Sequence, residues 1–239
     1  MAPRPRSGSG GEVVSGEVQK ILRQQHEPSV LSILEVRSRS RYEAPMSCHW
    51  ALYSLRTDRF TELFTPAGRQ HQAELVTAMT EGDLFDFDDP DLVKAALKKA
   101  FESGFSYASA SEEEAAILDC VISAVVAHKP LAKFLEVQPR SPKGLAPSAV
   151  EELLEDDDTE SLLAIFPEGG KRWGIAKPEY SEHFLLTPTE VASLLRQAEE
   201  GMQRLDKANA EVREHLEMEL IQPLRKVVAL GFGLAGVSP

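Results

Sequence analysis

Cys48 and His49 are adjacent in the chain, and a thiol beside an imidazole is the pairing that a cysteine nucleophile and its base require. The segment 49–55 (HWALYSL) has the composition of a strand. Neighbouring residues on a strand point to opposite faces, so the two side chains diverge. We therefore expect no catalytic function for Cys48. Cys120 lies in an apolar helical pattern and is expected to be a small packing residue.

A second arrangement has the spacing of metal ligands. Glu211, His215 and Glu219 recur four residues apart in a predicted helix, which places them on one face. A solvated helical face with i,i+4 pairs explains the same spacing more simply, and we favour that interpretation. The sequence predicts neither a metal site nor a cofactor.

The most unusual segment is 81–91 (EGDLFDFDDPD), in which aspartates alternate with Leu84, Phe85 and Phe87. It is not an EF-hand loop, because Asp88 and Lys94 stand where a loop starting at Asp83 needs glycine and glutamate. One interpretation is that these acids cap the next helix, with Asp89 as N-cap, and solubilise buried phenylalanines. The other is an acidic docking surface for a basic partner. The residues that would form that surface are Asp83, Asp86, Asp88, Asp89 and Asp91.

Composition and charge exclude several classes of protein. The 38 acidic and 26 basic residues give a net charge of −12 and a pI near 5.0, which argues against a nucleic-acid phosphate binder. No apolar run approaches the roughly 18–20 residues that cross a bilayer. Two cysteines are too few for a disulfide scaffold or a thiolate zinc site. We expect a cytoplasmic protein without a membrane span.

Residues 1–45 differ from the rest of the chain. They contain seven basic and five acidic residues, a net of +2, which leaves 19 basic and 33 acidic residues, a net of −14, in 46–239. One interpretation of 1–45 is a flexible or weakly docked extension. Another is an arm that binds a partner or a membrane surface through Arg37, Arg39 and Arg41. A third is that translation begins at Met46.

Hydrophobic periodicity and helix-start signals predict a single α+β domain over 46–239. Capping boxes begin two of the helices, at Ser111–Glu114 and Thr187–Glu190. The proline-rich segment 139–147 is expected to be a loop. We expect a small mixed sheet covered by helices, with two antiparallel helices and a short strand at the C-terminal end. The predicted strands are 49–55, 162–166, 172–176 and 232–237, with 184–186 as a further candidate, and the main predicted helices are 91–103, 112–128, 188–205 and 209–229.

The order of local motifs resembles the YfbM-like families of small bacterial proteins of unknown function. The resemblance rests on the start at Met46 (MSCHWALYSL), the Leu186–Val191 helix start (LTPTEV) and the terminal helix and glycine-rich strand over 224–237. It implies a single α+β domain beginning at Met46 and brings no catalytic residues. The acidic segment 83–91 and the basic extension are not features that it predicts.

Two classes of function fit these observations. The first is a non-enzymatic binding or accessory protein, possibly of the immunity type, that masks a basic partner with its acidic surface. The second is an enzyme with a site assembled from scattered Asp, Glu and His residues. A pocket that contains His49 or His183 beside two carboxylates would favour the enzyme, and a flat acidic face would favour the binding protein.

Overall fold

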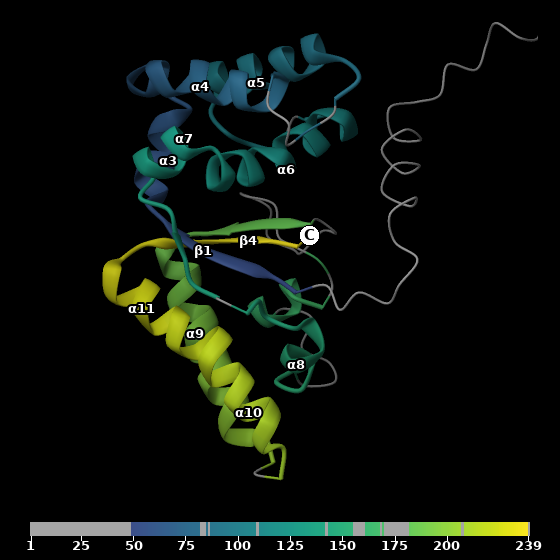
Figure 1. Ribbon diagram of the computed structural model, residues 1–239, viewed down its shortest axis with the longest axis vertical. Helices are drawn as coiled ribbons and strands as arrows, with labels where there is room; N and C mark the ends of the chain where they lie inside the picture. Colours follow the sequence, from purple (N-terminus) through teal and green to yellow (C-terminus); the bar gives the residue numbers. More distant parts are fainter. Residues whose placement is uncertain are drawn as a thin grey trace, which may run out of the picture. The chain divides into compact units, whose positions relative to one another are not determined.

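A four-stranded sheet lies between two layers of helices in the computed structural model of the chain (Figure 1). The structure describes residues 49–81, 85, 87–108, 110–141, 143–154, 161–167, 169, 182–206 and 208–238. The strands are β1 (Ala51–Leu55), β2 (Gln138–Pro139), β3 (His183–Leu186) and β4 (Gly233–Val237), in the order β2-β1-β4-β3. All pairings among these strands are antiparallel, where the sequence analysis expected a mixed sheet. The two central strands, β1 and β4, come from opposite ends of the compact unit Pro45–Pro239.

Successive side chains along each strand point to opposite faces of the sheet, so the sheet divides the hydrophobic core into two parts. Leu55, Leu185 and Ala235 face the first helical layer, whereas Leu52, Leu186 and Leu234 face the second. The first layer consists of α3 (Thr57–Leu63), α4 (Arg69–Thr80), α5 (Pro90–Ser103), α6 (Glu112–Ala127) and α7 (Lys129–Phe134). The second consists of α8 (Pro147–Glu151), α9 (Pro188–Arg204), α10 (Ala210–Leu216) and α11 (Gln222–Leu230).

The predicted α+β class is confirmed, and so are the main helices and their start signals. Ser111 and Thr187 each form a complete capping box with the glutamate three residues later. Helix α6 buries seven apolar residues and packs against α4, α5, α7 and β3, which makes it the central helix of its layer. Figure 1 shows α6 crossing above the sheet.

The C-terminal helices form the predicted antiparallel pair, with a turn before Asn209. A π-helical segment, Glu217–Ile221, joins α10 to α11. Pro223 explains it, because proline has no N–H for the carbonyl of Glu219 and its ring crowds that carbonyl. The wider turn instead lets the Gln222 N–H donate to the carbonyl of Glu217.

One predicted strand is wrong, and another segment could not be compared. Residues 162–166 form a 3₁₀ turn (Leu162–Ile165), which the Ser161 hydroxyl caps by accepting from the Leu163 N–H. The expected strand 172–176 lies outside the described residues, as does the expected N-terminal extension 1–45. Strand β2 was not expected, because it lies partly in the segment predicted as a loop. None of the described helices combines the length and the apolar character that a bilayer crossing needs.

Candidate functional site

The predicted docking aspartates surround the start of α5. Asp88, Asp89 and Asp91 are exposed, whereas Asp83 and Asp86 lie outside the described residues. Asp89 is the N-cap, as predicted: its Oδ1 accepts from the N–H groups of Asp91 at 2.9 Å and Leu92 at 3.1 Å. Asp91 also binds Lys94 Nζ at 3.2 Å. Asp88 makes no hydrogen bond or ion pair with any other residue that the structure describes.

Two phenylalanines lie beside these carboxylates. Phe85 and Phe87 are both half-buried, and their rings stack with centroids 5.6 Å apart and an interplanar angle of 29°. Their inner sides pack against the core of the first helical layer. The prediction of buried phenylalanines is therefore only partly right, because both residues keep some solvent exposure. We call Phe85, Phe87, Asp88, Asp89 and Asp91 the acid–aromatic surface.

A separate polar cluster joins α6 to the start of β3. Ser123 Oγ lies 2.5 Å from His183 Nε2, and both side chains are half-buried. Asp119 and Cys120 stand one turn before Ser123 on α6, and Glu182 precedes His183. From its sequence, His183 is only one of two candidate histidines, because the pairing of residues 60 positions apart leaves no local pattern.

The surroundings of this cluster favour the uncharged forms of its side chains. Burial lowers the pKa of His183 to about 4. Burial, and then the charge of Asp119, raises the pKa of Glu182. Burial, followed by the charges of Asp119 and Glu182, raises the pKa of the Cys120 thiol to about 12. The cluster therefore contains a neutral imidazole and a protonated thiol at neutral pH.

These properties bear on whether Ser123 and His183 form a nucleophile and its base. An efficient general base has a pKa near the working pH, and an imidazole with a pKa of about 4 is a weak base. Ser123 also lies inside α6, where the surrounding backbone N–H groups donate within the helix and are not free to bind an oxyanion. The contact is better suited to holding the helix against the strand. Cys48, the predicted neighbour of His49, lies outside the described residues.

The interpretation of Glu211, His215 and Glu219 as a solvated row is wrong for Glu219. That side chain is 1% exposed, and its Oε2 accepts from Ser141 Oγ at 2.8 Å and from the Lys143 N–H at 3.2 Å. His215 Nε2 lies 3.4 Å from the Ala146 nitrogen. Glu219 therefore connects the segment after β2 to the second helical layer through hydrogen bonds. Within the described ranges, no three His, Cys, Asp or Glu side chains are grouped as a metal site.

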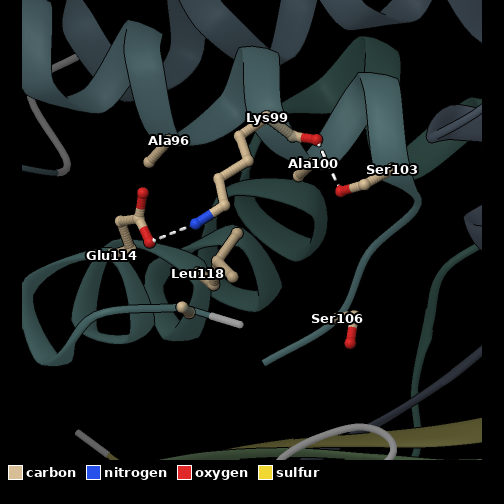
Figure 2. A pocket seen from close by; sticks show the side chains of 8 residues that line it. Ala96, Lys99, Ala100, Ser103, Ser106, Glu114 and Leu118 are labelled. Carbon is tan, nitrogen blue, oxygen red and sulfur yellow. Dashed lines mark hydrogen bonds and ion pairs between the residues drawn. The ribbon is translucent and has the colours of Figure 1, made fainter. Parts of the chain in front are cut away.

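A small hollow opens between α5 and α6 (Figure 2). Lys99 Nζ reaches across it to Glu114 Oε2 at 2.8 Å, and Ser103 Oγ donates to the Lys99 carbonyl. The Lys99 hydrogen bond, and then the Ser111 N–H, lowers the pKa of Glu114. The hollow is small and open, with about 240 Å³ of space between the atoms including the solvent that it opens to. Its charged groups already bind each other, so it is a weak candidate for a ligand site.

Comparison of the chain with protein-family models, curated proteins and solved structures finds no match. The resemblance to the YfbM-like families therefore stays a prediction. The acid–aromatic surface and the Ser123–His183 contact are the two features on which a functional proposal can be based.

Proposed function

We propose that this protein is a non-enzymatic binding or accessory protein that docks a basic protein partner through its acid–aromatic surface. The observation that carries the proposal is the pair of stacked, half-buried rings of Phe85 and Phe87 beside the exposed carboxylates of Asp88, Asp89 and Asp91. Asp83 and Asp86 add two charges to the same segment of the sequence.

The two kinds of side chain have separate functions in such a surface. Partly exposed aromatic rings supply apolar contact area at low entropic cost, and they are common at the centres of protein interfaces. The surrounding carboxylates attract a cationic partner and increase its association rate. Asp88 is the best placed for this, because it is exposed and makes no hydrogen bond or ion pair with another residue of the described chain, whereas Asp89 caps α5 and Asp91 binds Lys94.

The test uses a defined probe, a fluorescent amphipathic helical peptide rich in lysine and leucine, with an acidic peptide of the same pattern as control. We expect the basic peptide to bind and its affinity to fall as salt rises, because exposed charges are screened over ~8–10 Å at physiological ionic strength. Asp86→Asn/Asp88→Asn should lower the association rate more than it raises dissociation. Phe87→Ala should mainly raise dissociation.

The matched control is Glu62→Gln/Glu152→Gln, which removes two exposed charges from α3 and from the residue after α8. It should leave both rates close to those of the unmodified protein. Equal effects of the two double variants would mean that binding depends only on net charge. Binding that is indifferent to salt and to Asp86→Asn/Asp88→Asn would refute the docking proposal.

The second candidate is an enzyme, and the 2.5 Å contact between Ser123 Oγ and His183 Nε2 is the observation that favours it. Its test is labelling by a fluorophosphonate probe, which reacts with activated serines. Labelling that is lost in Ser123→Ala and in His183→Gln, but kept in Ser193→Ala, would support the enzyme. The low pKa of His183 and the position of Ser123 inside α6 make absence of labelling the expected result.

A further inference from the structure

We infer that His183 is a pH-sensitive latch, which holds α6 on the sheet while its imidazole is neutral and releases the helix when the imidazole gains a proton. This inference does not depend on the proposed binding function. It concerns the contact between α6 and β3, and the acid–aromatic surface lies at the start of a different helix, α5.

The position of His183 allows one side chain to control a whole layer. His183 begins β3 and lies on the same strand face as Leu185, which is buried in the core beneath α6. Its Nε2 meets Ser123 Oγ on α6 at 2.5 Å. Helix α6 packs against α4, α5 and α7, so it connects this contact to the other helices of the first layer (Figure 1).

Each described element packed around the imidazole contributes identifiable groups. Helix α6 contributes Asp119 and Cys120, in addition to Ser123, and β3 contributes Glu182. On β4, Val237 pairs with His183, and the Ser238 N–H donates to the Glu182 carbonyl at 2.8 Å. Among the described residues, the carboxylates of this cluster are Asp119, one turn before Ser123, and Glu182, next to His183.

Protonation changes what the imidazole can bind. In the tautomer that carries its proton on Nδ1, neutral His183 accepts the Ser123 hydroxyl proton at Nε2, whereas an imidazolium is a donor at both nitrogens. The hydroxyl hydrogen must then turn away so that Nε2–H donates to Ser123 Oγ, and a positive charge must remain in a half-buried position. The cost of removing this charge from water weakens the closed arrangement of α6 on β3.

The direction of the pH effect follows from proton linkage. His183 has a pKa of about 4 in the closed protein and about 6.5 when it is exposed to water, so the open form binds the proton at higher pH. Acidification from pH 8 to pH 5 therefore raises the opening equilibrium constant about 30-fold through this group. Glu182 acts in the opposite direction, because its pKa is raised in the closed form and acidification favours closure through it.

The experiment is hydrogen–deuterium exchange of the full chain between pH 5 and pH 8, corrected for intrinsic exchange rates and read by mass spectrometry. In the unmodified protein, opening of α6 and β3 should increase on acidification, by up to about 30-fold. His183→Gln cannot take up the proton, so the increase should vanish and the remaining slope should reverse because of Glu182. His71→Gln, on α4 of the same layer, is the control and should behave like the unmodified protein.

Three results would overturn the proposal that protonation of His183 releases α6 from the sheet. One is equal acceleration in α9–α11, which would indicate global unfolding and not release of α6. Another is acceleration that persists in His183→Gln. The third needs no variant: an NMR titration of His183 in the unmodified protein with a midpoint near 6.5 would show that the folded state does not disfavour the imidazolium.

Discussion

Glu219 Oε2 accepts a hydrogen bond from Ser141 Oγ at 2.8 Å, although the two residues stand 78 positions apart. Glu219 lies in the π-helical segment of the second helical layer, and Ser141 follows β2. The same oxygen accepts from the Lys143 N–H at 3.2 Å. One buried carboxylate thus supplies the acceptor for two donors of the proline-rich segment.

We predict that Glu219→Leu lowers the free energy of unfolding by about 2–5 kcal/mol, because a buried donor without an acceptor costs about 1–3 kcal/mol. Glu219→Gln keeps a carbonyl oxygen and should lose only about 1 kcal/mol. Urea denaturation measures both. Glu211→Leu, an exposed position of α10, is the control and should stay within about 0.5 kcal/mol of the unmodified protein. A similar loss for Glu211→Leu and Glu219→Leu would contradict the proposed role of the buried carboxylate.

The different outcomes for α5 and Glu219 show which features the sequence could predict. Asp89-Pro90 begins α5 through bonds to residues two and three positions later, so a short stretch of sequence contains the whole signal. Glu219 has the same four-residue spacing as Glu211 and His215, and only its distant partner Ser141 distinguishes it. Pro223, four residues after Glu219, was the one local sign of an irregular helix.

Short apolar runs were ambiguous for a similar reason. Residues 162–166 are long enough for either a strand or a turn, and the choice depends on tertiary contacts. Ser161 caps the turn, and the Phe166 carbonyl accepts from Trp50 Nε1 at 2.9 Å. Strand β2 contains Pro139, which is tolerated because β2 lies at the edge of the sheet. The Ser123–His183 contact had no local signal, since each residue type is common in its own element.

The N-cap of α5 provides the second prediction. Asp89→Ala should lower the free energy of unfolding by about 0.5–2 kcal/mol, because the N–H groups of Asp91 and Leu92 lose their acceptor. Asp89→Asn keeps an oxygen acceptor and should remain close to the unmodified protein. Asp88→Ala is the matched control and should change stability by no more than about 0.5 kcal/mol. Equal destabilisation by Asp88→Ala and Asp89→Ala would indicate that stability depends on the negative charge of this segment and not on the N-cap hydrogen bonds of Asp89.

The third prediction concerns the reactivity of Cys120. Its thiol has a pKa of about 12 because of burial and the neighbouring carboxylates, and the thiolate is the reactive form. In a Cys48→Ser background, alkylation by iodoacetamide at pH 8.5 should be on the order of 10³-fold slower in the native protein than in urea. Mass spectrometry of the modified peptide measures the rate. Native alkylation as fast as alkylation in urea would contradict the prediction that this partly buried thiol is unreactive.

The close approach of Gly236 and Phe184 provides the last prediction. Phe184 on β3 lies directly across Gly236 on β4, and a Cβ added at position 236 would overlap its ring. The ring has little room to move, because it is fully buried and its centroid lies 5.1 Å from Trp50 and 5.6 Å from Phe166. Gly236→Ala should therefore lower the free energy of unfolding by about 1–3 kcal/mol, the usual cost of overpacking a core.

A double-mutant cycle in urea separates this clash from other effects of the new methyl group. Phe184→Leu removes the ring atoms that a Cβ at 236 would meet, so Phe184→Leu/Gly236→Ala should be more stable than the sum of the single changes predicts. We expect a coupling energy of about 0.5–3 kcal/mol. Gly104→Ala is the comparison, since no side chain or backbone atom lies within 4 Å of its added Cβ and only its φ of 85° opposes the change. Gly104→Ala should cost about 1 kcal/mol and show no coupling to Phe184→Leu. Additive effects of Gly236→Ala and Phe184→Leu would mean that the glycine is needed for its backbone and not for the ring that lies against it.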